Sequence, residues 1–473
     1  MEYKEFLKQK TLRPIMTGFE VSRHDVQALA PILFLFQVDV VRWSLRLGKA
    51  ALFESVGLGK TLQQLVWAIF VMEYTNKPVL ILAPLAVNHQ TIIEGKEKLG
   101  LEVIFAEDKS VITGNGIYIA NYERLDKFDT SVFGGIVLDE ASILKSFMGA
   151  TKQALIEAFK GIDFKLVCTA TPAPNDFMEL GNYAEFLDIM PSYEMLMRFF
   201  INDTMKAGGY RLKKHADKGA FWEWITSWAV CLSNPRDLGH DYAMEGYDLP
   251  ALNIHYEWVG TSDATVQRAW SEGKLFSDSV SATDIHKVKR ESLDLRLART
   301  LELVNCHQDE PIIIWCELNV ESDALFQAFK HMGAVEVHGS QNNKLKEKNL
   351  IAFTKGDAPL IITKPSIAGM GLNWQHCARP IFFSPSFSFE NEYQALGRNH
   401  RYGQTREVHA HMIVSEVESN IADIVARKRA DFEVMQKKMN KAMSKHGLFR
   451  DISRSQLGDS FGNVEMIIPS WLN

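Results

Sequence analysis

The stretch Gly57-Leu58-Gly59-Lys60-Thr61 decides the fold of this chain. It follows an apolar run at residues 50–53, which predicts a buried strand, and it precedes residues 62–69, where apolar side chains recur at helical spacing. A glycine-containing turn between a strand and a helix directs unpaired backbone N–H groups and the positive end of the helix dipole towards an anion. With Gly57 and Gly59 in such a turn, Lys60 can reach the β and γ phosphates of a nucleotide and the Thr61 hydroxyl can bind Mg²⁺.

One position departs from the full phosphate-binding pattern. The pattern has a glycine at position 54, where this chain has Glu54. The alternative interpretation of the stretch is a flexible strand-to-helix turn that binds no phosphate. The rest of the chain decides between the two interpretations.

The composition is that of an ordinary globular protein. The 473 residues predict two or three domains, and 46% hydrophobic with 23% charged residues is typical of soluble chains. The N-terminus has no signal-peptide core and no apolar run approaches the roughly 20 residues that span a bilayer, so we expect a cytoplasmic protein without a membrane partner. A net charge of −6 neither indicates nor excludes nucleic acid. The five scattered cysteines argue against a zinc site or disulfides.

Two sets of short apolar runs predict an α/β fold with two parallel-sheet lobes in tandem. The first set is residues 79–82, 103–105, 117–120, 136–138 and 166–168, and the second is 312–315, 335–337, 360–363, 381–383 and 409–414. We expect lobe 1 at residues 1–189, a helical insertion and linker at 190–290, lobe 2 at 291–435, and a C-terminal tail at 436–473. A basic helix near residues 421–444 is expected to dock on lobe 2.

Asp139 and Glu140 end one of the predicted strands of lobe 1. Beside a phosphate-binding loop, Asp139 would bind Mg²⁺ through its water shell, and Glu140 would orient and deprotonate the attacking water. The alternative is an acidic strand-to-loop turn without catalytic function.

Arg398 and Arg401 lie three residues apart, a spacing that places them on one face of a helix. They belong to the other lobe from Lys60, so they reach a γ-phosphate only when the lobes close. An arginine finger of this kind contributes about 10³–10⁵ to turnover. The alternative is a surface helix whose arginines pair with carboxylates.

The ordered set of motifs resembles the superfamily-two helicases. The motifs are Gln37, GLGKT (57–61), APLAV (83–87), NYE (121–123), LDEAS (138–142), TATP (169–172), ITKPSIAGMGLN (362–373) and QALGRNHRYGQ (394–404). The last two, together with LDEASILKS, resemble the Swi/Snf branch, and residues 221–229 and 237–252 resemble its compact, phage-type members. The resemblance covers about residues 31–435.

The resemblance implies two RecA-like lobes and a role for each matched residue. Gln37 would recognise adenine, while Gly369 and Gly371 would let a loop of lobe 2 approach the nucleotide. Lys60, Thr61, the Asp139–Glu140 pair and the two arginines would have the roles derived above, with ATP and Mg²⁺ bound. Ser55 and Ser142 depart from the family pattern, and Ser142 bears on how ATP is coupled to DNA.

In this family the nucleic acid crosses both lobes. The candidate contacts begin loops that follow predicted strands: Pro84, Leu85, Asn121, Tyr122, Thr363 and Lys364. Backbone N–H groups in such loops bind phosphates without reading the bases, so we expect little sequence specificity and a strong salt dependence. The partner would be single-stranded, forked or duplex DNA, with replication or recombination proteins as further partners.

Residues between the lobes have two interpretations. Phe221, Trp222, Trp224 and Trp228 either pack against a lobe, which the helical spacing favours, or form a wedge that stacks on bases. The basic residues Arg211, Lys213 and Lys214 either bind phosphates or form a solvated loop.

The motif set predicts a DNA-stimulated ATPase, a helicase or translocase, whose lobes stay apart until DNA brings the arginines to the nucleotide. One alternative is a duplex translocase that remodels nucleoprotein without unwinding. Others are a non-motor, ATP-gated DNA-binding adaptor and a small-molecule kinase.

Overall fold

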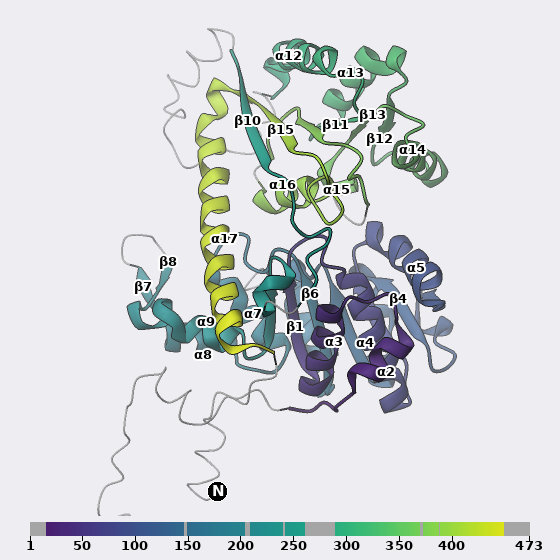
Figure 1. Cartoon of the computed structure of the whole chain (residues 1–473), viewed down its shortest axis with the longest axis vertical. Helices are drawn as coiled ribbons and strands as arrows, with labels where there is room; N and C mark the ends of the chain where they lie inside the picture. Colours follow the sequence, from purple (N-terminus) through teal and green to yellow (C-terminus); the bar gives the residue numbers. More distant parts are fainter. Residues whose placement is uncertain are drawn as a thin grey trace, which may run out of the picture.

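The protein has two lobes joined along one side by a long C-terminal helix (Figure 1). The structure is a computed structural model that describes residues 16–145, 149–203, 209–239, 242–260, 289–368, 372–386 and 388–448. Both lobes contain a parallel sheet covered by helices on its two faces, which confirms the predicted α/β class. No helix in these ranges is long and apolar enough to cross a bilayer.

Lobe 1 contains a seven-stranded sheet in the order β3-β4-β2-β5-β6-β1-β9. Its strands are β1 (Lys49–Glu54), β2 (Val79–Ala83), β3 (Val103–Phe105), β4 (Ile117–Asn121), β5 (Gly135–Asp139), β6 (Phe164–Thr169) and β9 (Ala229–Leu232). Its helices are α2 (Arg23–Leu29), α3 (Leu35–Leu47), α4 (Lys60–Thr75), α5 (Leu85–Leu99), α6 (Ala150–Ala158), α7 (Leu180–Phe186), α8 (Ser192–Phe199) and α9 (Phe221–Ile225). A hairpin of β7 (Phe200–Asp203) and β8 (Gly209–Leu212) projects beside α8.

Strand β6 lies between β1 and β5, so the carboxyl ends of all three meet at one edge of the sheet. Glu54 therefore ends β1 on the same edge at which Asp139 ends β5. Both faces of this sheet are apolar: in β2, Leu80 and Leu82 enter one buried cluster and Ile81 enters the other. Burial on both faces is the reason that the strands are continuous apolar runs in the sequence.

Lobe 2 contains a six-stranded parallel sheet in the order β10-β15-β14-β11-β13-β12. Its strands are β10 (Leu252–Val259), β11 (Ile312–Trp315), β12 (Val335–Val337), β13 (Leu360–Thr363), β14 (Arg379–Phe382) and β15 (Val408–Ser415). Its helices are α12 (Leu293–Cys306), α13 (Asn319–Phe329), α14 (Asn343–Lys355), α15 (Pro365–Ala368) and α16 (Phe389–Leu396).

The segment predicted as a helical insertion at 190–290 contributes a strand to each sheet. Strand β9 pairs with β1 and completes the sheet of lobe 1, while β10 pairs with β15 and forms an edge of lobe 2. The aromatic residues Phe221, Trp222, Trp224 and Trp228 are all at most 2% exposed. Their predicted packing role is confirmed, and a base-stacking wedge is not compatible with this burial.

Helix α17 (Ser419–His446) leaves lobe 2 after β15 and runs down the side of lobe 1 (Figure 1). Phe432, Met435 and Met439 enter the buried cluster that contains the aromatic residues of α9. The helix contacts α16 of lobe 2, as predicted, through Phe432 and Arg429, and it also packs on lobe 1, which was not predicted. The predicted boundary at residue 435 also falls inside the helix, because the apolar face continues through its methionines.

Candidate functional site

A cavity of 370 Å³ lies between the two lobes. Lobe 1 contributes Gln37, Gly57, Gly59, Lys60, Thr61, Asp139 and Glu140, and lobe 2 contributes Arg398 and Arg401. These are all the residues predicted at the nucleotide and metal site except Gly369 and Gly371, which lie outside the described residues. Residues far apart in the sequence therefore meet in one cavity.

The phosphate-binding loop needs glycine at two positions. Gly57 has φ +93° and Gly59, the N-cap of α4, has φ +81°, both in the left-handed region. A Cβ atom at Gly59 would lie 2.2 Å from Gln37 Nε2, and one at Gly57 would lie 2.9 Å from the backbone nitrogen of Tyr402 in lobe 2. The two glycines thus allow the tight turn of the loop and the close approach of Gln37 and Tyr402.

Gln37 forms a hydrogen bond with the phosphate-binding loop. Its Nε2 donates to the Leu58 carbonyl at 2.8 Å, and its Oε1 accepts from the Phe34 N–H at 2.9 Å. Gln37 is only 3% exposed, so its amide stabilises the loop from the protein interior. Its recognition of adenine stays a prediction.

Lys60 lies at the start of α4 with its ammonium group directed back into the loop. Its Nζ donates to the carbonyls of Glu54 at 2.7 Å and Ser55 at 3.2 Å. The Glu54 side chain is fully buried under the loop and accepts from Gln63 Nε2 at 2.8 Å. Burial raises the pKa of Glu54 to about 7, although the nearby Lys60 opposes the shift.

Asp139 and Glu140 line the same cavity as Lys60. Asp139 accepts hydrogen bonds from Gln64 Nε2 and from the Glu140 N–H, both at 3.0 Å, and burial raises its pKa. Burial, together with the Asp139 carboxylate, raises the pKa of Glu140 to about 7. Glu140 also has φ +49°, a strained conformation for a residue with a side chain and one that concentrates at functional sites.

The two arginines lie in the turn that follows α16. Helix α16 ends at Leu396, so the prediction that they share a helical face is wrong, yet both point to the cavity. Both donate to the Leu372 carbonyl, Arg398 Nη1 at 3.3 Å and Arg401 Nη1 at 3.0 Å. Burial lowers the pKa of Arg398 to about 9 and that of Arg401 to about 10. Two neighbouring cations, the buried Arg398 and the half-buried Arg401, favour an anion between the lobes.

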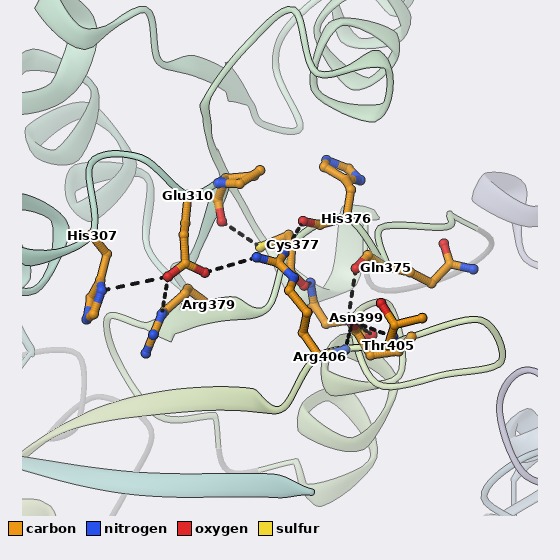
Figure 2. A network of polar contacts seen from close by, with 11 residues as sticks. His307, Glu310, Gln375, His376, Cys377, Arg379, Asn399, Thr405 and Arg406 are labelled. Atoms are coloured by element: carbon orange, nitrogen blue, oxygen red, sulfur yellow. Dashed lines mark hydrogen bonds and ion pairs between the residues drawn. The ribbon is translucent and has the colours of Figure 1, made fainter. Parts of the chain in front are cut away.

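A polar network holds this turn on lobe 2 (Figure 2). Glu310 accepts from Arg379 Nε at 3.1 Å and from Arg406 Nη1 at 3.2 Å. Gln404 Nε2 donates to the carbonyls of Gln375 at 2.8 Å and Asn399 at 3.0 Å. The segment that carries the arginines is thereby fixed to lobe 2.

The cavity residues fit a triphosphate with Mg²⁺. Loop N–H groups, Lys60 and the arginines are donors for phosphate oxygens, and the Arg401 Nε is buried without a hydrogen-bond partner among the described residues. The described ranges contain no cluster of three or more His, Cys, Asp or Glu that could hold a metal. Mg²⁺ binds through one or two carboxylates together with substrate phosphates, and Asp139 places one carboxylate at the cavity. Thr61 and Asp139 would hold it.

Three aromatic residues that line the cavity were not predicted. The ring of Tyr247 lies 4.6 Å from that of Tyr402 and 5.6 Å from that of Phe34, between ring centroids. They come from the linker, lobe 2 and lobe 1. Tyr402 stands inside the QALGRNHRYGQ motif and could have been noticed, whereas nothing in the sequence marks Tyr247.

The predicted nucleic-acid contacts have different surroundings. Leu85 is 70% exposed beside Pro84, the N-cap of α5, and Lys364 Nζ donates to Asn319 Oδ1 at 2.6 Å. Thr363 is fully buried, so its side chain does not face solvent in this structure. The remaining two residues contact their own lobe: Asn121 accepts from Asn88, and the 6%-exposed Tyr122 donates to the Asp139 carbonyl at 2.8 Å. Their contact with nucleic acid stays a prediction.

The TATP segment contacts lobe 2 directly. Thr171 Oγ1 donates to Glu390 Oε1 at 3.3 Å, and Lys145 Nζ lies 2.8 Å from Glu390 Oε2. The loops that follow β5 and β6 in lobe 1 are therefore both joined to α16.

The fold and the cavity define a class of protein: a two-lobed parallel α/β protein with a phosphate-binding loop in one lobe and an arginine-bearing turn in the other. The helicase conserved C-terminal domain family matches residues 295–403. Putative protein p41 of Acyrthosiphon pisum secondary endosymbiont phage 1 is 23% identical over 87% of this chain and 98% of its own.

Two cellular relatives extend the comparison. The SWI/SNF-related matrix-associated actin-dependent regulator of chromatin subfamily A-like protein 1 of Bos taurus is 22% identical over 87% of this chain and 46% of its own. The uncharacterized ATP-dependent helicase YqhH of Bacillus subtilis is 21% identical over 82% of this chain and 76% of its own. These similarities confirm the predicted resemblance to Swi/Snf-type superfamily-two helicases, phage-type members included. The chain spans nearly all of the phage protein but less than half of the bovine one.

Among solved structures, the SWI2/SNF2 ATPase core of Sulfolobus solfataricus in complex with dsDNA is similar at 20% identity. The match covers 90% of this chain and 96% of that one with a TM-score of 0.40, a level that adds nothing to the fold described above.

Proposed function

We propose that the protein hydrolyses ATP when it binds DNA and uses the hydrolysis to move along DNA. The observation that carries the proposal is the meeting of Lys60 and Glu140 of lobe 1 with Arg398 and Arg401 of lobe 2 around one cavity. A triphosphate there would contact groups from both lobes, so its hydrolysis would be linked to their relative position.

Each residue has a role that its surroundings support. Lys60 would exchange its two loop carbonyls for phosphate oxygens, and the arginines would neutralise the charge that develops on the γ-phosphate. Mg²⁺, when bound by Thr61 and Asp139, would supply further charge neutralisation. Glu140 would remove a proton from the attacking water, because a carboxylate with a pKa of about 7 accepts a proton readily at neutral pH.

DNA would act by favouring contact between the lobes. From the sequence, we expect the arginines to stay away from the nucleotide until a DNA strand bridges the lobes. In the structure the lobes are in contact through Glu390 and α17. The proposal is that DNA favours this contact and that hydrolysis weakens it. Loops beginning at Pro84, Asn121 and Lys364 would bind the phosphates, which makes binding salt-dependent and largely indifferent to sequence.

The resemblance to Swi/Snf-type relatives is compatible with two kinds of movement along DNA. Strand separation would give unwinding of a forked duplex, and duplex translocation would give displacement of a triplex strand without unwinding. ATPase rates with single-stranded DNA, duplex DNA and RNA, measured beside these two assays, test the proposal. A rate that no nucleic acid changes would overturn it in favour of an adaptor or a small-molecule kinase.

A further inference from the structure

Ser55, in the loop that precedes Lys60, is contacted by residues from three other parts of the chain. Its hydroxyl accepts from Tyr393 of α16 at 3.4 Å and from Gln436 Nε2 of α17 at 3.2 Å. Its backbone N–H donates to the Leu232 carbonyl of β9 at 2.9 Å, and its carbonyl accepts from Lys60 Nζ at 3.2 Å. Ser55 therefore links the C-terminal helix to the lysine of the phosphate-binding loop.

Helices α16 and α17 pack as one unit. The Phe432 ring of α17 lies 5.2 Å from that of Phe389 and 5.1 Å from that of Tyr393, and Arg429 forms an ion pair with Glu392. Helix α16 leads directly into the turn that carries Arg398 and Arg401. The groups that contact Ser55 thus belong to the same unit as the arginines of the cavity.

The other half of α17 is attached to lobe 1. Asn440 Nδ2 donates to Ser233 Oγ at 2.8 Å, and Lys445 Nζ lies 2.7 Å from Glu223 Oε1. Because β9 pairs with β1, this docking sets the distance from Gln436 to the end of β1, where the phosphate-binding loop begins. A shift of α17 along lobe 1 would break the contact with Ser55.

We infer that Gln436 and Tyr393 are positioning residues for ATP binding. They hold Ser55, and with it the backbone of the phosphate-binding loop, in place while the arginine-bearing turn is at the cavity. A movement of lobe 2 would then shift α17 and, through it, the phosphate-binding loop. The inference rests on the proposed function, since the loop must bind a triphosphate for its position to matter.

The test uses the full-length protein with Gln436→Leu, Tyr393→Phe and Ser55→Ala, each of which removes one polar group from the contact. KM and kcat for ATP are measured at saturating DNA. We expect KM to rise about 3- to 10-fold for each variant, as for the loss of a hydrogen bond, with kcat nearly unchanged. Ser55→Thr, which keeps the hydroxyl, is expected to retain the wild-type KM.

A double-mutant cycle separates positioning from general destabilisation. In the Ser55→Ala background, Gln436→Leu should raise KM no further, because the two side chains act through one contact. Lys437→Ala is the matched control: it changes an exposed side chain of α17 next to Gln436, and its KM should equal that of the wild type.

Two results would overturn this inference but leave the proposed function intact. One is a lowered thermal stability of the variants with an unchanged KM, and the other is that Ser55→Ala and Gln436→Leu change KM independently in the cycle. A wild-type chain that binds no ATP would overturn the proposed function, and this inference with it.

Discussion

Gln394 of lobe 2 donates a hydrogen bond from its Nε2 to Glu140 Oε2 of lobe 1, at 3.3 Å. The proposed general base is therefore held by the helix that leads to Arg398 and Arg401. This contact joins water activation in one lobe to charge neutralisation by the other.

Glu140→Gln should stop hydrolysis while ATP still binds. The amide cannot accept the proton of the attacking water, and general-base catalysis contributes about 10²–10⁴ to such a rate. Single-turnover hydrolysis and equilibrium ATP binding check the prediction together. Wild-type hydrolysis by the variant would remove Glu140 from the mechanism.

Lys60→Ala should abolish the ATPase activity by weakening ATP binding itself. The variant loses the cation that lies at the start of α4, at the cavity. Lys77→Ala, on the loop before β2 and outside the cavity, is the matched control and should behave like the wild type. Equal ATP affinities in the two variants would contradict the assignment.

The turnover rate should fall as the pH drops through about 7. Glu140 must be deprotonated to act as a base, and burial together with Asp139 raises its pKa to about 7. The measurement is kcat at saturating ATP and DNA between pH 5.5 and 8.5. A rate that stays constant across this range would show that Glu140 does not act as the base.

Glu54→Gln should stabilise the protein at high pH. The folded state raises the pKa of Glu54 from 4.5 to about 7, so the folded state binds the proton more tightly than the unfolded state. The free energy of unfolding therefore decreases as the pH rises from about 4.5 to about 7, and the substitution removes this decrease. A gain of about 3 kcal/mol is expected at pH 8 and little at pH 4.5.

Unfolding by urea at the two pH values measures this difference. An equal change at both pH values would contradict a buried, ionising Glu54 and would point to altered packing under the loop.

Trp222→Ala should destabilise the protein by about 3–5 kcal/mol, as expected for a large side chain that leaves a cavity. Trp222 is 2% exposed, and its ring lies 5.0 Å from that of Phe221 and 5.5 Å from that of Phe177. The ATPase rate per folded molecule should be retained. Trp258→Ala, at a residue 54% exposed, is the control and should change stability little. A Trp222→Ala protein as stable as the wild type would contradict the packing role of this residue.

Local patterns predicted most of the fold. The strands of both sheets are apolar runs because both of their faces are buried, and the phosphate-binding loop has a local pattern set by Gly57 and Gly59. Strand β9 could not be separated from the aromatic helix before it, because four apolar residues directly continue that helix's pattern.

The rest of the site depends on contacts between segments far apart in the sequence. Tyr247 reaches the cavity from the linker, and Gln436 reaches Ser55 only because α17 returns to lobe 1. Neither residue has a neighbour in the sequence that indicates its partner. The spacing of Arg398 and Arg401 suggested a helix, but α16 ends before them. Both arginines nevertheless line the cavity, as predicted.

The central claim is that residues of both lobes act on one triphosphate, and Arg401→Ala tests it most directly. The variant should bind ATP as the wild type does, because the binding loop and Lys60 are intact in lobe 1. Its DNA-stimulated turnover should fall by about 10³–10⁵, as expected for a lost arginine finger. Full DNA-stimulated turnover in Arg401→Ala would contradict the account.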